Sequence, residues 1–168
     1  MNAKKTRRGR WRVGDVVAIP LGESGVVGFG LVLKAPLMAF FDASVPTGRE
    51  PSAEQILRYP VAFKICVMRK PLVSGEWPRL GTVDVPEKLL EEPWFFMQDA
   101  LNGKITITKT GAEQLPAEPG QVDNLERAAV WSACHVVNRL QEHFAGRPNR
   151  WIGSALVKPR PGASPKST

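Results

Sequence analysis

The sequence predicts an α+β fold, in which a mainly antiparallel, strongly curved or barrel-like sheet packs against one C-terminal amphipathic helix. Three observations support this class: short β-forming runs joined by short links, an Asn102-Gly103 hairpin signal, and one apolar stripe at helical spacing near residue 140. The 168 residues suffice for one domain with a proper core. We expect a single globular domain over residues 13–157, between a basic disordered tail over 1–12 and a flexible tail over 158–168.

The first half of the chain predicts a β-meander. Residues 13–20, 26–33 and 38–42 are apolar runs rich in β formers, and the LGESG turn separates the first two. Residues 52–58 begin with Ser-Ala-Glu after a proline and suit one or two turns of helix. Residues 61–68 (VAFKICVM) predict a central strand.

Smaller elements follow in the second half. A strand near residues 81–85 precedes a short helix within 86–93. Asn102-Gly103 predicts a type I′ turn, and the alternating KITITK of residues 104–109 predicts the strand after it. We expect an edge strand within residues 150–157.

Residues 125–131 leave two alternatives open. They form a final strand, or they belong to one long helix that begins at Asp123. In the first case Ser132 caps a helix over residues 133–145, which Gly146 and Pro148 end. The apolar stripe of that helix is Val136, Val137, Leu140 and Phe144.

Gly25, Gly28 and Gly30 raise the question of a phosphate-binding loop. Such a loop needs a strand, a glycine-rich turn and then the N-terminus of a helix. Here Val, Phe, Leu and Val continue as a strand, without a Lys-Ser/Thr pair. Gly25 therefore fits a hairpin turn. Gly28 and Gly30 fit strand positions where the sheet bends or a neighbour approaches closely.

The positive charge lies at the two ends of the chain. The net charge is +7, yet residues 13–157 hold 14 basic and 16 acidic side chains. A nucleic-acid-binding domain is expected to carry its basic residues on the folded surface. Nucleic-acid binding through the basic tail remains an alternative. The N-terminus lacks the apolar stretch of a secretory signal, and no run is long enough to span a bilayer, so we expect a cytoplasmic protein.

Histidines and cysteines are too few and too scattered to predict a metal site or a cofactor. His135 and His143 lie about 12 Å apart along a helix, too far to share one metal ion. With Arg139 and Glu142 they predict a solvated polar face. Ser132, Cys134 and His135 adjoin in sequence, but adjacent helical positions point in different directions. The two cysteines, Cys66 and Cys134, are expected to be buried free thiols.

Two further groups of residues are candidates for a site. Glu91 with Glu92, and Asp42 with Asp99, can act as acid and base only if the fold unites them. The run Trp94-Phe95-Phe96 is expected to be buried on both sides, or to provide an exposed anchor at a protein interface.

Several segments together resemble the immunity protein 26 family. They are GDVVAIPLGESGVVGFGLVL, PVAFKICVMRKPLVSGEWPRLG, PWFFMQDALNGK and ERAAVWSACHVVNRLQEHFAGRPNRW, and the resemblance covers roughly residues 11–151. The resemblance implies a bacterial protein of a polymorphic-toxin system that neutralises a cognate toxin by binding it, as a monomer or homodimer. Some members are labelled phosphotriesterases of the HocA type, which implies hydrolysis of organophosphate triesters.

Binding agrees better with these residues than catalysis does, because inhibition by binding needs a shaped surface and no special chemistry. No residue role is transferred from the family. The candidates for catalysis are Asp42, Asp99, Arg127 and His135. The candidates for partner binding are Trp94, Phe95, Phe96, His135 and Arg139.

Overall fold

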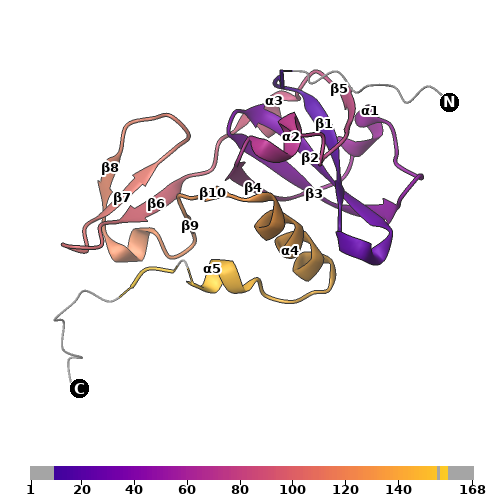
Figure 1. The fold of residues 1–168 in the computed structure, drawn as a ribbon. Coiled ribbons are helices and arrows are strands. Elements are labelled where there is room, and N and C mark those ends of the chain that lie inside the picture. Colours follow the sequence, from indigo (N-terminus) through magenta and orange to yellow (C-terminus); the bar gives the residue numbers. More distant parts are fainter. Residues whose placement is uncertain (1–9, 155, 159–168) are drawn as a thin grey trace. The chain divides into compact units, whose positions relative to one another are not determined.

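The computed structural model describes residues 10–154 and 156–158, which divide into two compact units. The first unit contains residues up to Glu92 together with Ala129–Asn149, and the second contains Pro93–Ala128 together with residues from Arg150 onward. Each unit holds one sheet, and most strand pairs are antiparallel (Figure 1). The α+β class is therefore confirmed.

The first unit contains a six-stranded sheet in the order β10-β4-β3-β2-β1-β5. Only β10 and β4 run parallel in it. Its strands are β1 (Asp15–Pro20), β2 (Val26–Lys34), β3 (Leu37–Pro46), β4 (Val61–Val67), β5 (Arg79–Thr82) and β10 (Val130–Trp131). The helices of the unit are α1 (Ala53–Ile56), α2 (Lys70–Val73), α3 (Glu87–Leu90), α4 (Ala133–Phe144) and the 3₁₀ turn η1 (Gly22–Ser24).

This sheet is open and not strongly curled, so the expected strongly curved or barrel-like sheet is wrong. Its edge strands, β10 and β5, have only two and four residues and do not pair with each other. Closure is also unnecessary for burial, because both faces of the central strands are covered. Residues on one face, such as Val17 and Phe40, are as buried as Leu31 and Phe41 on the other. Strands buried on both faces carry nearly continuous apolar runs, as these do.

Helix α4 packs on one face of this sheet through Val136 and Leu140. Of the two glycines in the middle of β2, Gly28 faces this helix and Gly30 faces side chains of the neighbouring strands. A Cβ atom on Gly28 would lie 3.4 Å from Leu140, and one on Gly30 would lie 3.1 Å from Met38 and 3.3 Å from Ile19. The strand pairing with β3 also shifts between these two glycines. Close approach thus explains Gly30, whereas Gly28 would meet Leu140 at an ordinary contact distance and lies where the strand pairing is irregular. Gly25 occupies the predicted turn with φ of 67°.

The start of α4 decides between the two alternatives for residues 125–131. The helix begins at Ala133, and the preceding residues form the short strands β9 (Glu126–Arg127) and β10. A long helix from Asp123 is therefore wrong. Ser132 occupies the N-cap position, but its side chain makes no capping hydrogen bond. Its hydroxyl oxygen lies 3.2 Å from the sulfur of Cys134.

The second unit contains a four-stranded sheet in the order β8-β7-β6-β9. Phe96, Ile105 and Val122 form its small core. Its further strands are β6 (Phe95–Gln98), β7 (Ile105–Thr108) and β8 (Leu115–Ala117), with the 3₁₀ turn η2 (Pro119–Gln121) after them. The predicted hairpin exists as β6 and β7, paired antiparallel.

Two local expectations fail in this unit. The hairpin turn is not type I′, because that turn needs a positive φ at both central residues and only Gly103 has one, at 70°. The described residues of 150–157, all but residue 155, do not form an edge strand either. They begin with helix α5 (Arg150–Ser154), whose backbone groups can pair within the helical turn, and no described strand of the second sheet pairs with them.

No helix in the described part of the chain is both long and apolar enough to cross a bilayer.

Candidate partner-binding site

The candidate residues are divided between the two units. Asp42, His135 and Arg139 belong to the first unit, whereas Asp99 and Arg127 belong to the second. Asp42 pairs with a histidine of α4: Nε2 of His143 lies 2.8 Å from Oδ1 of Asp42. About half of the Asp42 side chain is exposed, so this pair ties α4 to β3 at the surface. His135 is half-buried and has polar or ring contacts of its own.

Arg139 is buried, which corrects the expectation that it belongs to a solvated polar face. Its guanidinium carbon lies 3.9 Å from the centre of the Phe63 ring and 5.0 Å from that of Trp131. A guanidinium can lie flat against aromatic rings because it is planar and more weakly hydrated than an ammonium group. Arg139 therefore joins α4 to strands β4 and β10, and only 6% of the residue is exposed.

The aromatic run of the second unit has two buried members and one exposed member. Phe95 and Phe96 are buried, whereas Trp94 is 37% exposed. The ammonium group of Lys109 lies 5.0 Å from the centre of the Trp94 ring. Arg127 lies in the same way over Phe96, at 5.1 Å. Of the three aromatic candidates, only Trp94 presents much of its side chain to solvent.

Asp99 organises the turn between β6 and β7. One oxygen of its carboxylate accepts the backbone N–H groups of Leu101 at 2.7 Å and Asn102 at 3.0 Å. These hydrogen bonds, with that from Asn102 contributing most, lower the pKa of Asp99 because they stabilise the ionised carboxylate. Gly103 donates its N–H to the carbonyl oxygen of Asp99 at 2.9 Å. Asp99 is thus a structural residue of the turn.

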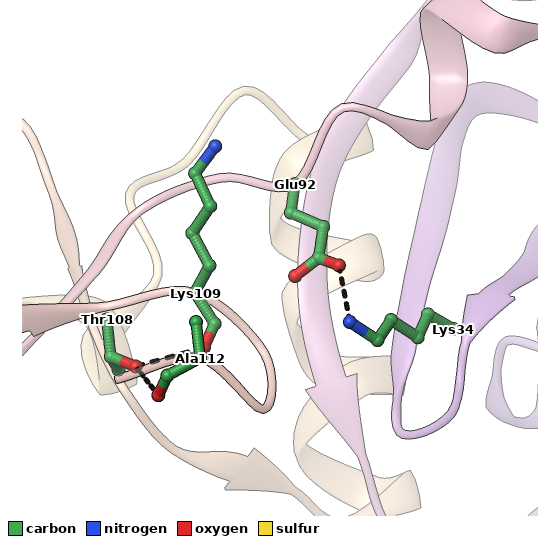
Figure 2. Close-up of polar contacts among 5 residues, drawn as sticks. All are labelled: Lys34, Glu92, Thr108, Lys109 and Ala112. Atoms are coloured by element: carbon green, nitrogen blue, oxygen red, sulfur yellow. Dashed lines mark hydrogen bonds and ion pairs between the residues drawn. The ribbon is translucent and has the colours of Figure 1, made fainter. Parts of the chain in front are cut away.

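Two lysines contact residues 89–92, the segment that precedes the second unit along the chain. The ammonium group of Lys64 donates to the carbonyl oxygens of Leu89 and Glu91 at 2.9 and 2.7 Å. Partial burial lowers the pKa of Lys64, and the nearby Glu91 carboxylate opposes this shift. Figure 2 shows the ion pair between Lys34 and Glu92, whose nitrogen and oxygen are 3.0 Å apart. Both acidic candidates of this segment lie beside structural lysines.

A loop after β7 is also closed by local hydrogen bonds. The hydroxyl group of Thr108 lies 2.9 Å from the carbonyl oxygen of Lys109 and 3.2 Å from that of Ala112 (Figure 2). These contacts fix the backbone beside Lys109, the residue whose ammonium group covers Trp94.

Among residues 10–154 and 156–158, no three His, Cys, Asp or Glu side chains form a group able to hold a metal ion. Cys66 and Cys134 are free thiols, as expected, but Cys66 is only half-buried and Cys134 is exposed, so the expected burial is wrong. What these units display instead is a set of exposed apolar side chains. Leu101 is the extreme case, with 93% of its surface exposed, and it is not among the residues that the sequence patterns indicate. A leucine inside a turn signalled by Asn102-Gly103 could have identified it, because turn positions usually carry polar residues.

Comparison with known proteins identifies one family. The family model of immunity protein 26 matches residues 12–106, which is more than half of the chain. These residues include strands β1 to β6 and the turn that carries Leu101, whereas α4 lies outside them. No curated protein and no solved structure matches the chain. The chain belongs to the immunity protein 26 family.

Proposed function

We propose that this protein neutralises a cognate bacterial toxin by binding it. The observation that carries the proposal is membership of the immunity protein 26 family over residues 12–106. An immunity protein acts by forming a stable complex, so it needs a rigid scaffold and an accessible surface. The open sheet with two buried faces supplies the scaffold, and the exposed side chains of the 93–104 region supply accessible surface.

The contacts of three polar groups, of which Asp99 is a catalytic candidate, support binding rather than catalysis. Asp99 accepts hydrogen bonds from its own turn, Lys64 donates to backbone carbonyls, and Arg139 lies between aromatic rings. Each of these groups stabilises local structure. A catalytic acid, base or electrophile would instead have to direct its polar atoms toward a substrate.

The proposal extends to the setting in which the protein acts. We place it in the cytoplasm, where it meets a toxin that enters or is made in the same cell. We expect it to act as a monomer or homodimer, and we expect residues 13–157 to suffice for neutralisation.

Co-expression provides the test. Immunity proteins are encoded beside their toxins, so the toxin domain encoded by the neighbouring gene is expressed with and without this chain. We expect growth to be rescued only when the chain is present, and we expect the two purified proteins to form a complex. A lack of both rescue and complex would refute the proposal. Turnover of a chromogenic phosphate triester by the purified protein, reduced in His135→Ala, would instead favour hydrolase activity.

A further inference from the structure

The turn between β6 and β7, residues 99–104, displays one apolar side chain almost completely to solvent. Leu101 is 93% exposed, whereas the other exposed large hydrophobic residues of the described chain lie between 37% and 57%. Ala100 and Asn102 beside it are exposed as well. A leucine at this position gains nothing for the fold of the chain itself, because it contacts little of it.

The turn is held rigid by its own hydrogen bonds. The Asp99 carboxylate accepts two backbone N–H groups, and the Asn102 side-chain oxygen accepts the N–H of Lys104 at 2.8 Å. Asp99 N–H donates to the carbonyl oxygen of Lys104, which closes the turn at 2.9 Å. Gly103 supplies the left-handed conformation, with φ of 70°, that lets the chain return to β7. The backbone that carries Leu101 is therefore held at the tip of the turn.

Such an arrangement is typical of a binding anchor. An apolar side chain on a preorganised backbone loses little conformational entropy when a partner buries it. The turn also lies inside the residues that match the family, so it belongs to the part of the chain on which the family assignment rests.

We propose that the 99–104 turn is the anchor of the toxin complex, and that Leu101 inserts into an apolar pocket on the toxin. This inference rests on the proposed function and adds the surface that performs it. The exposed ammonium group of Lys104 follows at the base of the turn, so the pocket is expected to carry a carboxylate on its rim. Trp94, at the start of the same hairpin, offers a second exposed contact.

Affinity measurements with matched variants test the anchor. The toxin domain encoded by the neighbouring gene, purified in an inactive form, is titrated against the full chain and against Leu101→Ala. We expect the truncation to weaken binding by about 10- to 100-fold, because a fully buried leucine side chain contributes that much. The controls are Leu90→Ala and Leu115→Ala, two leucines that are each 46% exposed and lie outside the turn. We expect each control to bind within about twofold of the unmodified chain.

A second variant separates the rigid turn from the leucine itself. Asp99→Ala keeps Leu101 but removes the acceptor of two backbone hydrogen bonds. We expect it to weaken binding by about three- to tenfold, with a circular-dichroism spectrum unchanged from that of the original chain. Leu101→Ala should also melt at the same temperature as the original chain, since its side chain is exposed.

The outcomes distinguish this inference from the function on which it rests. If the original chain binds the toxin and Leu101→Ala binds equally well, the anchor is wrong and the proposed function stands. If the original chain does not bind the toxin, both the anchor and the proposed function are wrong. Loss of a homodimer in Leu101→Ala, with toxin affinity retained, would assign the turn to self-association. Binding of the original chain, but not Leu101→Ala, to phosphatidylglycerol vesicles with toxin affinity retained would assign it to a membrane.

Discussion

The guanidinium carbon of Arg139 lies 3.9 Å from the centre of the Phe63 ring, between helix α4 and strand β4. A helical wheel places this arginine on a polar face, yet the residue is only 6% exposed. Its aliphatic stem and flat head fill space beside the apolar stripe, while the aromatic rings face its charge. The contact thus uses a charged residue as part of a helix–sheet interface.

Arg139→Ala is expected to lower the free energy of unfolding by about 2–3 kcal/mol, because it removes both the ring contacts and the buried stem. Urea denaturation followed by tryptophan fluorescence measures the change. Arg147→Ala, which truncates an exposed arginine beyond the end of α4, is the control and should change the value by less than about 0.5 kcal/mol. Equal effects of the two substitutions would show that the contacts of Arg139 with the Phe63 and Trp131 rings do not contribute to stability.

Much of the fold could be predicted from the order of apolar runs. Strands β1, β2 and β4, helix α4 and the β6–β7 hairpin coincide with predicted elements, because each has a strong local pattern. Helix α2 was not predicted, since four residues that begin with Lys-Pro carry no periodicity. The open sheet could not be predicted, because closure depends on how the edge strands pair rather than on their sequences.

The candidate site could be predicted only in part. Trp94 is a predicted interface residue and is exposed, but its two neighbours face inward. The pairing of Asp42 with His143 joins residues 101 positions apart, and no spacing rule predicts such a contact. Leu101 was not predicted as an exposed residue, because leucine is the ordinary residue of a core, and its place beside Asn102-Gly103 is the one sequence signal that points to a turn. Only the hydrogen bonds of Asp99 and Gly103 show that its backbone is fixed at a tip.

Gly30 provides a test of packing on the inner face of β2. Gly30→Val is expected to destabilise the protein by about 1–3 kcal/mol, because the new side chain would overlap Met38, Ile19 and Phe40, which lie 3.1–3.4 Å from the position that a Cβ atom would occupy. Thermal unfolding measures the effect. Gly28→Ala is the matched comparison, since its Cβ would meet its nearest neighbour, Leu140, at an ordinary contact distance of 3.4 Å. We expect it to change stability by less than about 1 kcal/mol. A Gly30→Val protein as stable as the original would show that this face of the sheet can accommodate the larger side chain.

The buried carboxylate of Asp15 tests the edge between β1 and β5. It lies 2.8 Å from the guanidinium of Arg79 and accepts the hydroxyl of Thr82 at 2.6 Å, while only 1% of the side chain is exposed. Asp15→Ala is expected to cost about 2–4 kcal/mol, because hydrogen bonds to a charged group are lost together and Thr82 loses its acceptor. Asp15→Asn keeps the shape and should cost less. Chemical denaturation of both variants measures the two costs. An Asp15→Asn protein more stable than the original would show that the buried negative charge is unfavourable.

Asp99 gives the pH dependence of the hairpin. Its pKa in the folded protein lies below the ordinary value of 3.8, owing to the backbone N–H groups of Asn102 and Leu101. The unfolded chain therefore binds more protons than the folded one between the two pKa values, so the contribution to stability is full above 3.8 and is lost as the pH falls through the lower value. NMR titration of the Asp99 carboxyl carbon should give a midpoint below 3.8, and the Leu101 amide should shift with the same midpoint. Asp99→Asn should abolish that common transition. A Leu101 amide that titrates unchanged in Asp99→Asn would show that another carboxylate controls the turn.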